Sequence, residues 1–288
     1  MKTIAIFLVV AAAIAQANVL PYTSAHGYLE NSIKLAEQIR EREERSLSQR
    51  IVGGSSAEEG QFPYQAGLLT DMIGLQGNGV CGGSLVSANR VVTAAHCWFD
   101  GMHQAWRVTV ILGSTRLFSG GQRLATSAVV THPGWQPPLI RHDVAIIYLP
   151  SNAVMSNTVA PIALPSGDLL NQNFVGELAT ASGFGLTSDN ANITTNQFLS
   201  HVNLNVISNN ICRFSFPLLI QEDHICTSGL GGVGTCRGDS GGPLVIFRNN
   251  SPILIGITSF GSPLGCESIM PAAYARVTEY VDFINQHL

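Results

Sequence analysis

Short apolar runs separated by turn-forming residues constrain the fold of this chain more than any other feature. The runs are rich in Val and Ile or apolar throughout, and segments rich in Gly, Pro and Asn separate them. They occupy residues 108–112, 128–132, 143–149, 201–206, 243–247 and 253–259. Many short strands of this kind predict an all-β barrel or sandwich. Apolar residues at roughly helical spacing over 278–288 predict a helix at the end of the chain.

Composition favours a compact, loop-rich protein. Charged residues make up 12% of the 288 positions and 29 residues are glycine, a balance that disfavours a disordered or coiled-coil chain. The length allows one large all-β domain or two small ones. The formal net charge is −4 and no basic stripe is present, so we expect no nucleic-acid partner.

The first 50 residues differ from the rest of the chain. Residues 1–17 contain a lysine, a short apolar run and an Ala-Gln-Ala cleavage pattern, which predict a signal peptide and a secreted protein. That run is too short to span a bilayer, and we expect no membrane association. Residues 18–50 form a leader without cysteine, and its part from 31 to 50 is rich in Glu, Arg, Gln and Leu, which favours helix.

Residues 238–243, with the sequence Gly-Asp-Ser-Gly-Gly-Pro, carry the strongest sign of chemistry. This is a poor helix or strand sequence, and it predicts a tight turn that exposes the Ser240 hydroxyl and directs N–H groups at one point. Acyl transfer needs such donors, because its tetrahedral intermediate carries a negative oxygen. Taken alone, the motif could also be a glycine-rich loop without chemistry.

A serine nucleophile needs a base and an acid that orients the base. His96 lies in the segment Thr-Ala-Ala-His-Cys, where small neighbours leave room for the imidazole. Asp143 precedes an apolar run, where its carboxylate could be buried against that imidazole. Each residue alone could be structural, but together with Ser240 they predict nucleophilic catalysis.

With these segments the chain resembles the chymotrypsin-like (trypsin-fold) serine endopeptidases. Its lack of lysine after residue 50 is similar to the midgut chymotrypsins of caterpillars. The matching segments are Ile51-Val52-Gly53-Gly54, 93–97, 143–147, 238–244, 259–261 and 274–277. The resemblance implies two six-stranded antiparallel Greek-key barrels, with the active site between them and a C-terminal helix.

The resemblance also implies a role for each site residue. His96 would take the proton of Ser240, Asp143 would orient His96, and the N–H groups of Gly238 and Ser240 would form the oxyanion hole. Ser259 would support Asp143.

Six cysteines, all after residue 80, suit an oxidising compartment. The sequence alone leaves their pairing open. The resemblance selects the pairs Cys81–Cys97, Cys212–Cys226 and Cys236–Cys266.

Activation by cleavage is a further implication of the resemblance. Arg50-Ile51 would be cut by a trypsin-like protease, and the new Ile51 ammonium would pair with Asp239 and order the oxyanion hole and the specificity pocket. A loop acid that accepts backbone hydrogen bonds is the alternative for Asp239. Because residues 18–50 contain no cysteine, we expect the leader to separate from residues 51–288, the protease domain.

The resemblance places Gly234 at the floor of the specificity pocket, Gly261 and Ala272 at its walls, and the strand through Ser259 and Phe260 beside the substrate backbone. Gly234 offers no acid, and burying an unpaired cation there would be costly, so we do not expect cleavage after Arg or Lys. Large apolar or aromatic residues are the expected substrates, and an elastase-like preference for small apolar residues is the alternative.

Glu267 is the main argument against this pocket assignment if it lies near the pocket rim. The alternative is that it is a solvated loop acid. We expect no metal or cofactor, because residues 112–124 lack the carboxylates of calcium-binding trypsins and no His–Cys zinc spacing is present. Glycosylation of Asn192 and Asn249 stays open.

The predicted protein is a digestive endopeptidase of the extracellular space, in the gut lumen. It would be a monomer that acts on proteins and peptides and is open to protein protease inhibitors. A catalytically inactive binding homologue and a cascade protease are the alternatives, although cascade proteases usually carry cysteine-rich modules upstream.

Overall fold

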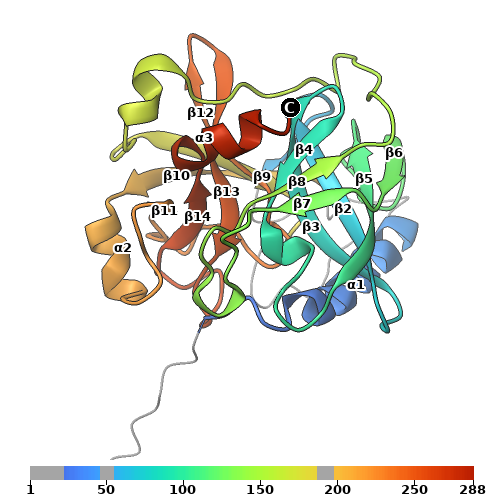
Figure 1. The fold of residues 1–288 in the computed structure, drawn as a ribbon, viewed down its shortest axis with the longest axis horizontal. Helices are drawn as coiled ribbons and strands as arrows, with labels where there is room; N and C mark the ends of the chain where they lie inside the picture. Colours follow the sequence, from blue (N-terminus) through green and yellow to red (C-terminus); the bar gives the residue numbers. More distant parts are fainter. Residues whose placement is uncertain (1–22, 46–54, 187–197) are drawn as a thin grey trace, which may run out of the picture.

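The computed structural model describes residues 23–45, 55–186 and 198–288 (Figure 1). The predicted signal peptide and the Arg50-Ile51 junction lie outside the described residues, as does Asn192. In the described part of the chain, no helix combines the length and the apolar composition that a bilayer span requires.

The strands of the described chain form two curled antiparallel sheets, which confirms the predicted all-β fold. The first sheet holds β2 Gln65–Met72, β3 Asn78–Ser87, β4 Arg90–Thr93, β5 Ala105–Leu112, β6 Gln122–Thr126, β7 Val129–Thr131 and β8 Ala145–Tyr148. Its order is β6-β5-β2-β3-β4-β8-β7. Only residues 127 and 128 separate β6 from β7, so the chain itself joins the two edges of this sheet. Counted as one interrupted strand, β6 and β7 give the six strands expected for this barrel.

The second sheet holds β1 Ser55–Ser56, β9 Leu178–Gly183, β10 Ser200–Ile207, β11 His224–Thr227, β12 Pro243–Arg248, β13 Ser251–Phe260 and β14 Ala272–Arg276. Its order is β1-β10-β11-β14-β13-β12-β9, and β9 also pairs with β10. That pairing closes a ring of six strands. The short β1 adds to the outer side of β10, with Ser55 opposite His201.

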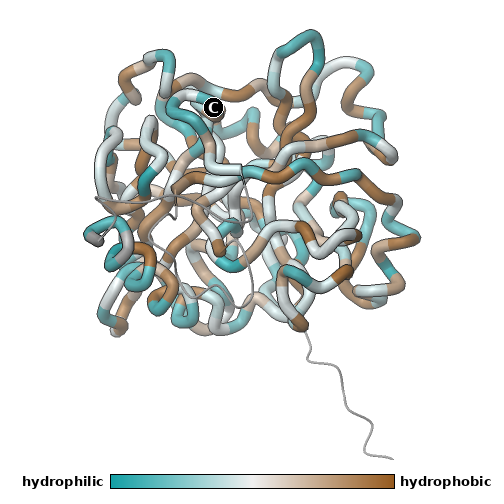
Figure 2. Tube along the Cα trace, turned by 180° about the vertical axis from the view of Figure 1, so that it is seen from behind, coloured by the Kyte–Doolittle hydropathy of each residue, from teal (hydrophilic) through white to brown (hydrophobic). Residues whose placement is uncertain are grey.

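Each of the six predicted strand regions contains a strand, and α3 Val277–Asn285 lies at the predicted C-terminal helix. A second helix, α2 Asn209–Ser215, follows Ser208, whose side chain accepts a hydrogen bond from the Ile211 N–H. Residues 253–260 of β13 are all buried, which is why their sequence is almost continuously apolar. Figure 2 shows hydrophobic stretches interspersed with hydrophilic ones along the chain.

The leader contains the helix α1 Tyr28–Arg45, which overlaps the region 31–50 that favoured helix and begins three residues before it (Figure 1). Its buried positions recur every three or four residues, which places them on one face. They are Leu29, Ser32, Leu35, Ala36, Ile39 and Glu43. Because Leu35, Ala36 and Ile39 belong to the same hydrophobic cluster as the first barrel, the leader is packed as part of the core.

Three disulfides join the cysteine pairs that the family resemblance implied. They are Cys81–Cys97, Cys212–Cys226 and Cys236–Cys266. The first fixes the short 3-10 helix Ala95–Cys97, which carries His96, against β3. The third holds the turn before Ser240 against the segment after β13.

Candidate active site

His96, Asp143 and Ser240 come from separate elements and meet between the two barrels. His96 lies in the 3-10 helix after β4, Asp143 precedes β8, and Ser240 lies in the turn before β12. Their exposed fractions are 2%, 1% and 8%. The Gly82 N–H of the first barrel donates to the Ser240 carbonyl oxygen at 2.7 Å, which ties the two halves of the site together.

Asp143 holds His96 at two points. One carboxylate oxygen accepts from the His96 backbone N–H at 2.9 Å, and the other lies 2.7 Å from Nδ1 of the ring. Ser259 of β13 donates its hydroxyl to that second oxygen at 2.6 Å. A buried carboxylate with these partners fixes the imidazole with Nδ1 protonated, which leaves Nε2 as the basic nitrogen. Ser259 thus lies where the family resemblance placed it.

Nε2 of His96 is buried and accepts no hydrogen bond from the described residues. The His96 ring instead has the Tyr28 ring of the leader at its edge, with 4.5 Å between centroids. Tyr28 is a site residue that the sequence did not identify. The apolar face of the leader helix could have indicated it, because such a face must pack against another surface of the protein.

The turn around Ser240 depends on glycine. Gly238 has φ 98° and Gly241 has φ 80°, a region that favours glycine. A Cβ at Gly241 would lie 2.1 Å from the Thr93 hydroxyl oxygen, so the turn also packs tightly against the segment that leads to His96.

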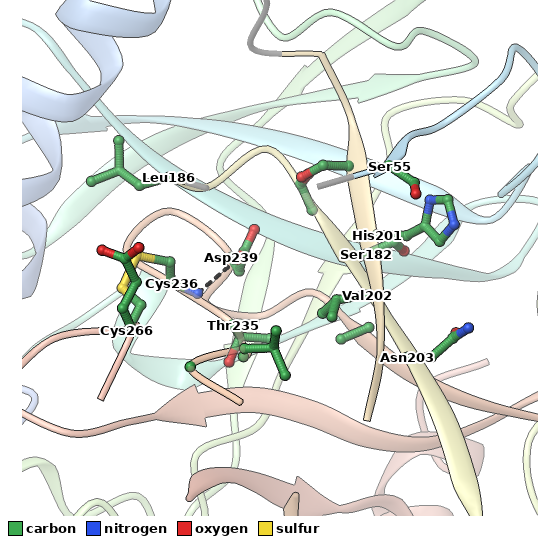
Figure 3. A pocket seen from close by; sticks show the side chains of 17 residues that line it. Ser55, Ser182, Leu186, His201, Val202, Asn203, Thr235, Cys236, Asp239 and Cys266 are labelled. Carbon is green, nitrogen blue, oxygen red and sulfur yellow. Dashed lines mark hydrogen bonds between the residues drawn. A yellow bond between two sulfur atoms is a disulfide. The ribbon is translucent and has the colours of Figure 1, made fainter. Parts of the chain in front are cut away.

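Asp239 borders a cavity of about 290 Å³ (Figure 3). Its carboxylate accepts from the backbone N–H groups of Cys236 and Gly185, both at 2.8 Å. Burial raises the pKa of Asp239 to about 6, although these two hydrogen bonds oppose the shift. The site therefore disfavours an unpaired charge and would favour a cation beside it.

The predicted pocket residues divide into two groups. Gly234 and Glu267 both line the cavity beside Asp239. Gly261 and Ala272 are not among the lining residues. Ala272 packs in the core of the second barrel, and a side chain at Gly261 would point into open space.

Phe260 does not face the cavity. Its ring is buried and lies edge-on to the rings of Phe216 and His224, with centroids 5.3 Å and 5.7 Å away. Its backbone pairs with Ala273 of β14. Phe260 is thus a buried residue of the second barrel and does not line the cavity.

Cys81, His96 and Cys97 form a compact group of potential metal ligands among the described residues. The two sulfur atoms are bonded to each other, so they cannot serve as thiolate ligands. The group is explained by the disulfide that fixes the His96 segment.

Comparisons with known proteins agree with this geometry. The profile of a family described as Trypsin matches residues 51–284. A collagenase of Hypoderma lineatum is 38% identical over 242 residues, covering 83% of this chain and 87% of the relative. Brachyurin of Leptuca pugilator is 36% identical over 237 residues, covering 81% and 96%. A solved structure of HL collagenase has a TM-score of 0.74 and 37% identity, covering 82% of this chain and 98% of that one.

Proposed function

Because the chain belongs to the trypsin family of serine endopeptidases, we propose that it is a secreted digestive protease, made as an inactive precursor and cut at Arg50-Ile51. The arrangement of Asp143, His96 and Ser240 carries this proposal. Secretion is supported by the three disulfides, which form and persist in oxidising compartments.

The proposed mechanism follows from the hydrogen bonds of His96. With Nδ1 held by Asp143, Nε2 takes the Ser240 proton as the hydroxyl attacks the scissile carbonyl, and later returns it to the leaving amine. The cation that forms on His96 is stabilised by the Asp143 carboxylate, which Ser259 in turn holds in place. The N–H groups of Gly238 and Ser240 are the proposed donors to the oxyanion.

The environment of Asp239 supports the proposed activation. The carboxylate borders a cavity whose lining includes Ser55, four residues beyond Ile51. Four extended residues span roughly 13 Å, enough for a freed Ile51 ammonium to enter that cavity. Its positive charge would compensate the burial that raises the pKa of Asp239.

The proposed specificity is for large apolar or aromatic residues. Gly234 places no acid at the expected floor, which disfavours Arg or Lys as the substrate residue. Glu267 lines the same cavity and is the residue that could instead favour a cation. The relatives named collagenase and brachyurin show that the same family scaffold occurs in other animal proteases.

The test is to cut the precursor with trypsin, confirm Ile51 as the new N-terminus, and profile cleavage of a peptide library. We expect cleavage after Phe, Tyr, Leu or Met, and Ser240→Ala should lower kcat by several orders of magnitude without unfolding the protein. No cleavage after a confirmed cut would contradict the enzyme assignment. Cleavage mainly after Arg or Lys would contradict the pocket assignment.

A further inference from the structure

The leader covers the catalytic residues. We infer that residues 23–45 are a built-in inhibitor, which blocks the site through Tyr28 and stays bound after the cut at Arg50 until it is removed. This inference rests on the proposed activation at Arg50. Activity would then require two events, the ordering of the oxyanion hole after the cut and the removal of the leader.

Tyr28 occupies the centre of the site. Its ring lies against His96, and its hydroxyl donates to the Val80 carbonyl oxygen at 3.1 Å. Burial raises the pKa of the Tyr28 phenol, while hydrogen bonding from the Ser240 side chain and the Gly238 backbone opposes that shift. The ring contact with His96 places Tyr28 over the proposed general base, where a substrate would have to bind.

Leu35 closes the site from the next turns of α1. It is 7% exposed, and a Cβ at Gly238 would lie 2.8 Å from one of its methyl carbons. Leu35 therefore packs directly against Gly238, the glycine whose N–H is a proposed oxyanion donor. The leader thus contacts both the proposed general base and the glycine that would donate to the oxyanion.

Polar contacts fix the start of the helix on the first barrel. The Leu29 N–H donates to the fully buried carboxylate of Asp100 at 2.9 Å, which supplies an acceptor at the positive end of α1. One turn later the Ser32 hydroxyl oxygen accepts from the Val80 N–H at 3.3 Å. A Cβ at Gly79 would lie 2.6 Å from that oxygen, so the glycine lets the helix approach β3.

Glu43 fixes the other end of the helix. Its carboxylate accepts from the backbone N–H groups of Leu117 and Phe118 and from the Ser119 hydroxyl, at 2.5 to 3.1 Å. These residues lie in the 112–124 segment, which has no carboxylate of its own. The leader supplies the charge that this loop lacks, and a charged acceptor of this kind is stronger than a neutral one.

Nothing covalent is needed to keep the leader in place. Leu29 and Ile39 are 0% exposed, and burying aliphatic side chains of this size stabilises the docked helix. The hydrogen bonds of Leu29, Ser32 and Glu43 involve no residue of the Arg50-Ile51 junction, so the cut does not remove them. The cut product is then a complex of the body with its own leader, and activity requires a second event that detaches or digests α1.

The experiment uses the full-length precursor with residues 46–50 replaced by an enteropeptidase recognition sequence that ends in lysine. The cut then leaves Ile51 as the new N-terminus and spares the arginines of α1. After complete cleavage of the Ser240→Ala form, we expect the leader to elute with the body in size exclusion at micromolar concentration. In the active form, the initial rate on a small peptide substrate should be at least about tenfold lower than after dilution releases the leader.

Variants of α1 distinguish blocking of the active site by the leader from a purely structural role of the leader. Leu35→Ala should weaken leader retention by about thirtyfold, the scale of a buried interface anchor, while Gln38→Ala on the exposed face of α1 should leave it unchanged. In the uncut precursor, Tyr28→Ala should let diethyl pyrocarbonate acylate His96 at least about tenfold faster than in the Gln38→Ala protein, as mapped by mass spectrometry. This second readout needs no catalysis.

Two results would overturn the inference. They are immediate separation of the leader after the cut, and full activity while the leader still elutes with the body. A retained leader together with equal acylation of His96 in the Tyr28→Ala and Gln38→Ala proteins would also overturn the blocking role. If the leader is retained and His96 protected, but no activity appears after release, the inhibitor contact stands and the proposed protease function fails.

Discussion

Three side chains at the residue scale decide whether His96 can act. Asp143 is 1% exposed and receives hydrogen bonds from the His96 backbone, the His96 ring and Ser259. The sequence predicted His96 and Asp143 from their own local segments, and the family resemblance implied the support from Ser259. Tyr28 escaped prediction, because its place beside His96 depends on how a separate helix packs.

Replacing Ser259 with alanine should lower both activity and stability. The Asp143 carboxylate would lose the donor at 2.6 Å, and a buried acceptor left short of a partner costs about 1 to 3 kcal/mol. We expect kcat to fall about tenfold with KM nearly unchanged, since the loss is felt in positioning His96. Ser251→Ala at the exposed start of the same strand is the control. Steady-state kinetics that show an unchanged kcat would contradict the positioning role.

The buried carboxyl of Asp239 predicts how the stability of the uncut precursor depends on pH. Its folded pKa of about 6 lies above the unfolded value of about 4, so between these values the folded state binds more protons. Stability should therefore fall as pH rises from about 4 to 6, by at most about 3 kcal/mol, and less where water in the cavity reaches the carboxylate.

Urea unfolding at several pH values measures this dependence. Asp239→Asn should flatten it, whereas Asp168→Asn at an exposed position should not. After the cut, pairing with the Ile51 ammonium should flatten it as well. A precursor whose stability rises over the same interval would show that the carboxyl is already charge-paired.

The observed strands agree with the sequence prediction where apolar residues are frequent and differ from it where glycine is frequent. The run at 253–259 became β13 with little change of bounds. The strand β3 was not predicted, because Gly79, Gly82 and Gly83 resemble turn residues. Its glycines answer a tertiary need, since a Cβ at Gly82 would lie 2.9 Å from the Gly242 Cα in the turn of the other barrel. The strand propensity of a short segment cannot predict such a close approach between two barrels.

The disulfide between β3 and the His96 helix offers a prediction at this scale. Cys81 and Cys97 are 16 residues apart, and a loop of that size implies about 3 kcal/mol of stabilisation in the chain-entropy account. We expect the double change Cys81→Ala and Cys97→Ala to lower the free energy of unfolding by about that amount. Urea denaturation followed by fluorescence measures it. A variant of full stability would place the holding force in the β3 and β4 pairing instead.

At the scale of the whole molecule, the two barrels bring together residues from distant parts of the chain. The family resemblance predicted this arrangement, because its motifs recur in order along residues 51–284. It could not predict the position of the leader, which lies outside the matched region. The complementarity of α1 to the first barrel is a property of this chain's own packing.

The charge of the mature part predicts alkaline tolerance. Residues 51–288 contain no lysine, and 9 arginines against 14 acidic residues give 9 − 14 = −5. Arginine keeps its charge where lysine, with a pKa near about 10.4, begins to lose it. The sensitive cation is then the proposed Ile51 ammonium, whose unfolded pKa is about 8.

Pairing with Asp239 should raise the pKa of that ammonium in the folded state. Its stabilisation is then complete below about pH 8 and is lost as pH rises through the higher folded value. We expect kcat/KM of the cut enzyme to hold beyond pH 8 and then fall reversibly. Acetylation of the Ile51 terminus should remove most activity at every pH. A profile that collapses near pH 8 would argue against the raised pKa.

Because α1 is held only by noncovalent contacts, dilution of the cut protein should release the leader. While the leader is joined to the body, its local concentration is in the millimolar range of a short flexible tether, and the site stays covered at any protein concentration. Once the chain is cut, occupancy follows mass action. At high protein concentration the cut protein would then stay inhibited by its bound leader. The same molecules would become active after dilution into a large volume.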